Sequence, residues 1–221
     1  MTEKNFTRLY LARHGQVTNH HELRYNGHFD VDITGKGLGQ MDNLAAFLKD
    51  CPLEAIYSSD LVRTYRGAEI AAKALGLKNK RLTDLRELCL GRWEGLSINE
   101  VKEKFPEEAG LRFRDLAHHR VEGGENIVDL SNRVTPAIEN LLKHHRGGAI
   151  LVLAHGGVNR TVLCNAMSLP LENFFKMEQD YGCLNIIDYY FNSSSAHQPE
   201  FAIVKMLNGG PNQDIHASKI Y

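Results

Sequence analysis

The feature that most constrains the fold of this chain is an unbroken run of six apolar residues at positions 149–154 (AILVLA). A strand with one wet face alternates apolar and polar residues, whereas a strand covered on both faces is apolar throughout. Just before it, apolar residues recur at helical spacing from Ile127 to Leu142. This alternation of buried strand and amphipathic helix predicts an α/β fold in three layers, with a mostly parallel central sheet and helices on both faces.

Shorter patterns place the remaining elements. Apolar runs predict strands at residues 8–12 and 55–57, and a late hairpin or edge strands around residues 184–190 and 201–207. Helix-forming stretches are predicted after the capping residue Thr34, over residues 61–75 as far as Gly76, and after Ser97, which has capping-box spacing to Glu100. No repeat or low-complexity linker divides the chain. We therefore expect one domain over residues 1–207 and a mobile tail over residues 208–221.

Composition narrows the classes of partner and compartment. The formal net charge of the 221 residues is −1, so the overall balance indicates neither nucleic acid nor an anionic membrane surface as a partner. The four cysteines are scattered without a C-x-x-C pair, which indicates free thiols in a reducing compartment. The N-terminus is polar and has no hydrophobic region of signal-peptide length, and no apolar segment elsewhere is long enough to span a bilayer. We expect a cytoplasmic protein with no membrane partner.

Two predicted strands end in similar motifs, LARHG at residues 11–15 and LAHGG at residues 153–157. Parallel strands present their carboxyl ends at one edge of a sheet, where ligands bind. Arg63 lies in the first turn of the helix that follows the strand at residues 55–57. If the three strands are neighbours, two arginines and two histidines converge on one spot, and an anion is needed to offset their charge. The residues alone therefore predict a phosphate or carboxylate site.

Taken in order, these motifs resemble the histidine phosphatase (phosphoglycerate mutase-like) superfamily. Arg13-His14-Gly15 is similar to its defining R-H-G signature, and residues 57–64 resemble the segment whose arginine binds phosphate. Glu87 with GRWEG at residues 91–95 resembles the segment of the catalytic acid. Gly124-Glu125 and residues 152–157 match two further segments. The resemblance extends from about residue 8 to about residue 160.

The resemblance implies the phosphoglycerate mutase-like fold and a set of roles. His14 would attack phosphorus and form a phosphohistidine. Arg13, Arg63 and His155 would hold the phosphoryl oxygens, with backbone help at Gly156, and no metal or other cofactor would be needed. Glu87 would protonate the leaving group and then deprotonate water. Glu94 is the competing acid, because it lies in the same segment.

Supporting contacts depart from the family pattern. Gln16 stands where the family usually has glutamate, and His20 stands where an asparagine usually binds phosphate. Either His20 or the preceding Asn19 is a candidate for that contact. Asn26 matches a polar phosphate-contacting position and is included in the predicted site.

Rival interpretations of the same residues are weaker. His14, His20 and His21 fit no metal-ligand spacing, and no carboxylate cluster accompanies them. The loop at residues 155–157 is similar to an oxyanion-hole loop, but the chain lacks a G-x-S-x-G elbow. The basic stretch of Arg112, Arg114, His118, His119 and Arg120 either overhangs the site and binds a second anionic group or forms a solvated helix face, and we favour the solvated face.

Three functions remain open. The favoured one is hydrolysis of a small phosphorylated metabolite, with α-ribazole 5′-phosphate as a candidate, because the interval between Glu87 and His155 is short and resembles the phosphatase branch. A phosphoglycerate mutase and a non-catalytic sensor of phosphate esters are the alternatives. The protein would act as a monomer or a homodimer.

Overall fold

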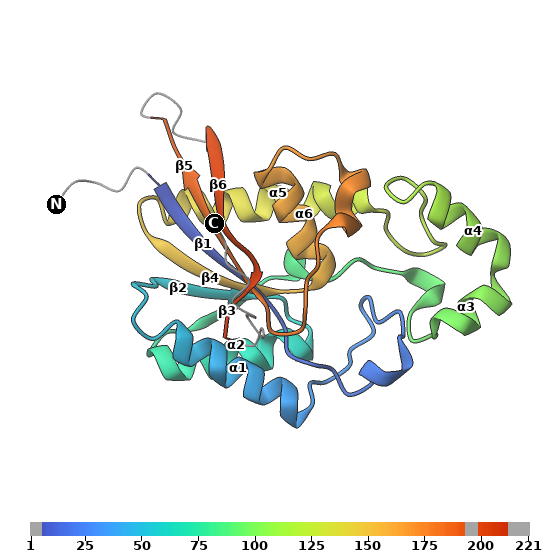
Figure 1. The fold of residues 1–221 in the computed structure, drawn as a ribbon, viewed down its shortest axis with the longest axis horizontal. Helices are drawn as coiled ribbons and strands as arrows, with labels where there is room; N and C mark the ends of the chain where they lie inside the picture. The colour runs from blue at the N-terminus through green and yellow to red at the C-terminus, as the bar shows by residue number, and fades with distance from the viewer. Residues whose placement is uncertain (1–5, 193–198, 212–221) are drawn as a thin grey trace, which may run out of the picture.

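The structure is a computed structural model that describes residues 6–192 and 199–211. Six strands form one sheet in the order β3-β2-β4-β1-β5-β6 (Figure 1). Their bounds are β1 Phe6–Arg13, β2 Ala55–Ser58, β3 Asn79–Arg81, β4 Ala149–Ala154, β5 Leu184–Tyr190 and β6 Phe201–Gly209. Strands β3, β2, β4 and β1 pair in parallel, whereas β5 is antiparallel to β1 and to β6. The predicted mostly parallel sheet is confirmed.

The described residues also form six α-helices. Their bounds are α1 Gly35–Phe47, α2 Val62–Leu75, α3 Ile98–Lys104, α4 Pro106–Arg114, α5 Ile127–His144 and α6 Gly156–Ala166. Short 3-10 helices are η1 His20–Glu22, η2 Thr83–Leu85, η3 Gly91–Trp93 and η4 Leu171–Lys176. The predicted capping residues are confirmed: Thr34 Oγ1 accepts from the Gly37 N–H at 3.0 Å, and Ser97 forms a capping box with Glu100. Gly76 ends α2 in the left-handed conformation that favours glycine.

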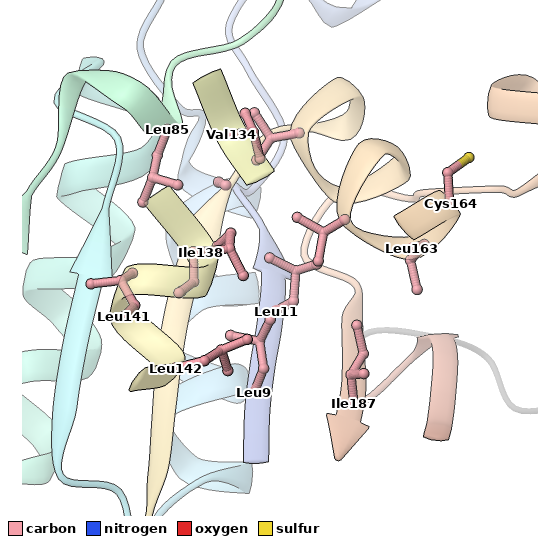
Figure 2. Packing of buried hydrophobic residues seen from close by; sticks show 14 of the residues in the cluster. Leu9, Leu11, Leu85, Val134, Ile138, Leu141, Leu142, Leu163, Cys164 and Ile187 are labelled. Carbon is pink, nitrogen blue, oxygen red and sulfur yellow. The ribbon is translucent and has the colours of Figure 1, made fainter. Parts of the chain in front are cut away.

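Two apolar clusters pack on the two faces of the sheet. Helices α1 and α2 cover one face, where Met41 and Leu44 lie against Leu151. Helices α5 and α6 cover the other, and Figure 2 shows Leu142 of α5 beside Leu9 of β1. Every residue of β4 is buried, as the unbroken apolar run predicts. Each fully buried aliphatic side chain stabilises the fold by about 1.5–3 kcal/mol, so these clusters fix the strands that end at the site.

A smaller third cluster lies beyond the sheet. Trp93, Val101, Ala109 and Val121 pack together in a region that includes η3, α3 and α4. In Figure 1 helices α3 and α4 lie beyond the end of the sheet at which β4 leads into α6. This region, residues 88–121, is called the cap below.

Strand β6 extends past Leu207, the residue at which the sequence analysis ends the domain. Asn208 and Gly209 belong to β6, and the Asn208 backbone N–H donates to Asn185 Oδ1 at 2.9 Å. The pairing of β6 with β5 continues to Gly209, which is why the strand extends past Leu207. Residues 212–221 lie outside the described residues. Among the helices that the structure describes, none combines the length and the apolar character needed to cross a bilayer.

Candidate active site

The sheet places the two histidine motifs side by side. Strands β1 and β4 pair in parallel with Arg13 opposite Ala154, so His14 and His155 follow at the same edge. Their ring centroids lie 5.3 Å apart. Arg63, in the first turn of α2, donates from Nε to His155 Nδ1 at 3.2 Å. The predicted convergence of these side chains is therefore what the structure shows.

The hydrogen bonds of His14 fix its tautomer. Nδ1 lies 2.8 Å from the Gly15 carbonyl oxygen, which can only accept, so Nδ1 carries the proton. Burial lowers the pKa of His14 well below its usual value, and the positive charges of Arg13 and Arg63 lower it further. The ring is neutral at pH 7, and its Nε2 holds a lone pair. This is the protonation state that a nitrogen nucleophile requires.

His155 has the opposite tautomer. Its Nδ1 accepts from the Arg63 guanidinium, which can only donate, so the neutral ring carries its proton on Nε2. That Nε2 is buried and has no hydrogen-bond partner among the described residues. Burial lowers the pKa of His155 well below its usual value, and Arg63 and His14 lower it further. A buried donor without an acceptor is unfavourable, and an anionic oxygen beside His14 would satisfy it.

Arg13 supplies a second such donor. Its Nη1 donates to the Gln179 carbonyl oxygen, and its guanidinium carbon lies 4.2 Å from the centroid of the Tyr181 ring. Its Nε is buried without a partner in the described part of the chain. Arg13 is thus held in place by Gln179 and Tyr181 while one N–H stays available for a ligand.

Arg63 is almost fully buried, with 1% of its surface exposed. Its Nη1 and Nη2 donate to the carbonyl oxygens of Phe29 (3.1 Å) and Gly27 (2.6 Å). These carbonyls belong to the loop between β1 and α1. Arg63 therefore joins that loop to His155 and fixes the wall of the site.

Backbone contacts hold the Glu87 carboxyl group in the cavity lining. Oε2 accepts from the Gly157 N–H at 3.0 Å, and Oε1 accepts from the Leu88 N–H at 2.9 Å. A Cβ at position 157 would lie 2.2 Å from Glu87 Oε1. The second glycine after His155 is thus required for the close approach of this carboxyl group.

Arg133 of α5 fixes the segment that carries Glu87. Its Nη2 donates to the Glu87 carbonyl oxygen at 2.8 Å, and its Nε and Nη2 form a fork on the Glu125 carboxylate, both at 2.8 Å. His28 Nε2 also lies 2.8 Å from the Glu87 carbonyl oxygen. Glu125 in turn accepts from the Cys89 N–H. The Gly124-Glu125 motif therefore serves to anchor the Glu87 segment.

Glu94 has a different environment. Its Oε1 accepts from the backbone N–H groups of His28 (2.7 Å) and Leu90 (3.0 Å), which ties two loops together. Glu94 does not line the cavity that holds His14, whereas Glu87 does. Of the two candidate acids, the geometry places only Glu87 where it can reach a ligand.

The supporting residues divide between the site and its surroundings. Asn26 lines the cavity, and its side chain exchanges two hydrogen bonds with Asn19, at 2.7 and 3.2 Å. His20 lies outside the cavity lining, with Nδ1 2.9 Å from the Val17 carbonyl oxygen. Asn19 therefore positions Asn26, whereas His20 is bonded to the backbone of its own loop. Gly156 is the first residue of α6, whose N-terminal end favours an anion.

The favoured prediction for the basic stretch is wrong for Arg112. This residue is 8% exposed and lines the cavity, because the turn after α4 folds back and its carbonyl oxygens hold the guanidinium. Arg114, His118 and Arg120 are exposed, as a solvated face requires.

The cavity has a volume of about 320 Å³ and contains several residues that the motifs did not indicate. Phe174, Phe175 and Tyr181 come from the irregular segment after α6, which has no periodicity to draw attention to them. Arg160 also lines it. Arg160 lies four positions after Gly156, so the two residues share one face of the helix, and this spacing could have indicated Arg160 as a site residue from the sequence. A larger cavity of about 440 Å³ between α5, α6 and β6 contains none of the predicted residues.

No group of three or more His, Cys, Asp and Glu side chains is placed to hold a metal ion within residues 6–192 and 199–211.

Comparisons with known proteins agree with the family resemblance of the motifs. Residues 9–198 match the family described as the histidine phosphatase superfamily (branch 1). Phosphoserine phosphatase 1 of Hydrogenobacter thermophilus is 33% identical over 182 residues, which are 80% of this chain and 82% of that protein. A probable phosphoglycerate mutase of Escherichia coli is 35% identical over 166 residues, 73% of this chain and 75% of that protein. The crystal structure of the α-ribazole phosphatase from Shigella flexneri superposes with a TM-score of 0.81 at 26% identity, covering 91% of this chain and 96% of the other.

Proposed function

This chain belongs to the histidine phosphatase superfamily, and from that premise we propose that it hydrolyses a small phosphomonoester through a phosphohistidine on His14, without a metal ion. One observation carries the proposal. The neutral His14, with its lone pair on Nε2, lies beside two buried donors that have no partner in the described residues, Arg13 Nε and His155 Nε2. A phosphoryl group between them supplies both the electrophile and the missing acceptors.

In the first step the Nε2 lone pair of His14 forms a bond to phosphorus as the P–O bond to the leaving alcohol breaks. The alkoxide takes a proton from the Glu87 carboxyl group and departs as the alcohol. Arg13, Arg63 and His155 offset the charge on the phosphoryl oxygens, which is the task that a metal ion performs in other phosphoryl-transfer sites.

In the second step water hydrolyses the phosphohistidine. Glu87, now a carboxylate, takes a proton from the water as its oxygen bonds to phosphorus. The P–N bond breaks, its electron pair returns to His14 Nε2, and inorganic phosphate leaves. Both steps use the same carboxyl group, which the Gly157 and Leu88 N–H groups keep in one place.

A phosphoglycerate mutase is the second candidate, because one relative of 35% identity carries that name. It would use the same His14 chemistry but return the phosphoryl group to a substrate. The two functions differ in whether inorganic phosphate accumulates.

The test is an assay of phosphate release from p-nitrophenyl phosphate, α-ribazole 5′-phosphate and 3-phosphoglycerate, with a chelator present throughout. We expect release that the chelator leaves unchanged, loss of at least about 1,000-fold in His14→Ala, and loss of about 100-fold or more in Glu87→Gln, since general acid catalysis contributes about 10²–10⁴-fold. Glu94→Gln is the control for the acid, and it should retain far more activity than Glu87→Gln. Activity that requires a divalent metal, or that survives in His14→Ala, would contradict the proposal. Phosphoryl exchange without phosphate release would indicate the mutase.

A further inference from the structure

The active-site cavity carries more positive charge than one phosphoryl group requires. Five arginines line it, with Glu87 as the one acidic side chain in the lining: Arg13, Arg24, Arg63, Arg112 and Arg160. Arg24 forms ion pairs with Glu22 and Glu100. Within the described residues the other four have no carboxylate at ion-pair distance. Buried charge without a counter-ion is unfavourable, so the cavity is suited to a ligand of more than one negative group.

Three of these arginines lie at the end of the cavity where His14 and His155 would hold the phosphoryl group, which is called the phosphoryl end below. Arg13 and Arg63 adjoin the two histidines, as described above. Arg160 joins them, because a Cβ at Gly156 would lie 3.1 Å from Arg160 Nη1 and 3.6 Å from the Arg13 guanidinium carbon. The positive charge of Arg13 also lowers the pKa of Arg160, after the larger effect of burial. The phosphoryl group therefore has its full set of cations without Arg112.

Arg112 comes from the cap, on the last turn of α4. Its Nη1 donates to the carbonyl oxygens of Leu116 (2.9 Å) and His119 (2.7 Å). These contacts fix the guanidinium without neutralising it. The acid that follows α4, Asp115, is bonded instead to His118, at 3.0 Å. Burial lowers the pKa of Arg112, but a guanidinium stays protonated in proteins, so the cap presents a fixed positive charge to the cavity.

We propose that the substrate carries a second anionic group, a carboxylate or a second phosphate, on the alcohol that leaves, and that Arg112 binds this group. The inference rests on the proposed phosphatase function and specifies its substrate class. A guanidinium suits either anion, because its planar fork can donate two N–H bonds to two oxygens. The volume of about 320 Å³ limits the alcohol to a small metabolite. α-Ribazole 5′-phosphate has no second anionic group, so the cavity disfavours it.

The experiment compares two esters that differ only in the second charge. 3-Phosphoglycerate has a carboxylate where glycerol 3-phosphate has a hydroxymethyl group. The purified full-length chain should hydrolyse 3-phosphoglycerate with a kcat/KM at least about tenfold higher, as expected for a charge-assisted hydrogen bond. Fructose 1,6-bisphosphate against fructose 6-phosphate tests whether a second phosphate serves instead.

Variants identify the residue responsible. Arg112→Gln should lower the preference for the doubly charged ester about tenfold or more. Hydrolysis of p-nitrophenyl phosphate, which has no second anionic group, is measured beside it to detect any disturbance of the cap. Arg114→Gln, on the same turn of α4 but exposed, should leave both values unchanged. Arg112→Lys keeps the charge but not the fork, so an intermediate preference is expected.

The outcomes separate the two proposals. Failure of the wild type to hydrolyse any ester, p-nitrophenyl phosphate included, overturns the phosphatase function itself. His14-dependent hydrolysis with no preference between the paired esters, or a preference that survives in Arg112→Gln, overturns only the role of Arg112. If Arg112→Gln also loses p-nitrophenyl phosphate hydrolysis because the cap is disturbed, Arg112→Lys decides, and an unchanged preference there contradicts the proposal.

Discussion

At the scale of single residues, the two histidines differ in the position of one proton. His14 is bonded to a carbonyl and His155 to a guanidinium, so one ring has its lone pair on Nε2 and the other has its proton there. Two neutral imidazoles 5.3 Å apart avoid mutual repulsion and take different tasks. The motifs identified both residues. The tautomers depend on the local backbone conformation at Gly15 and on the contact between Arg63 and His155, which could not be predicted from the sequence.

The same histidines predict how stability depends on pH. Their folded-state pKa values lie well below the unfolded value of 6.5. Below pH 6.5 the unfolded chain therefore binds protons that the folded chain does not, and the free energy of unfolding falls as the pH falls. The loss approaches about 1.4 kcal/mol per pH unit for each histidine until the folded pKa is reached.

Urea unfolding at pH 7.0 and 5.5 measures this effect. The variant His14→Asn/His155→Asn removes both titrating groups, so its free energy of unfolding should fall less between the two pH values than that of the wild type. Equal losses in the two proteins would show that the histidines are not held neutral by the fold.

The choice between Glu87 and Glu94 also lies at the residue scale. The two acids are seven positions apart in one irregular segment, and no local pattern separates them. The family resemblance favoured Glu87. The structure adds the reason: Glu94 binds the backbone of two loops, whereas Glu87 faces the cavity with His14 and Arg63.

At the scale of elements, α5 is coupled to the site through one side chain. Arg133 donates to the carbonyl oxygens of Asp84, Arg86 and Glu87 and to the Glu125 carboxylate. We expect Arg133→Met to lower kcat by about 10- to 100-fold, because a misplaced Glu87 transfers its proton less well. The competitive inhibition constant of inorganic phosphate should change much less, since the phosphoryl end is intact.

Arg120→Gln is the matched control for Arg133→Met. It removes an exposed ion pair between Arg120 and Asp129, and Asp129 belongs to α5, the helix that carries Arg133. Such pairs contribute about 0–1 kcal/mol. Steady-state kinetics of both variants give the kcat and the inhibition constant of inorganic phosphate that this prediction compares. A weakening of phosphate binding by Arg133→Met equal to the loss in kcat would show a general collapse of the site rather than a misplaced acid.

Element boundaries were predictable where capping or periodicity marked them. Thr34, Gly76 and Ser97 lie at helix ends as expected. Strand β3 was missed because its three residues, Asn79–Arg81, are polar and lie at the edge of the sheet. The segment from η4 to Tyr181 contributes aromatic residues to the cavity but contains no repeated spacing, so its role became visible only in the folded chain.

At the scale of the whole molecule, the position of the site follows from the topology. Strand β4 lies between β1 and β2, so the three functional strand ends are adjacent although they stand at residues 13, 58 and 154 of the chain. The unbroken apolar strand and the two strand-histidine-glycine motifs predicted this convergence only on the condition that the three strands are neighbours, and the structure supplies the strand order that meets the condition. The sequence offered a role for Arg112 at the site only as the less favoured alternative to a solvated face, because Arg112 enters the cavity through tertiary packing of α4 and not through any motif.

The central claim is that His14 carries the phosphoryl group, and trapping that intermediate tests it most directly. The enzyme is mixed with a ³²P-labelled ester, quenched within milliseconds in alkali and digested, and the labelled peptide is identified by mass spectrometry. We predict one phosphohistidine, stable in alkali and labile in acid, at His14, and no label in His14→Ala. Label on another residue, or rapid turnover in which no histidine becomes labelled and His14→Ala remains active, would contradict the account.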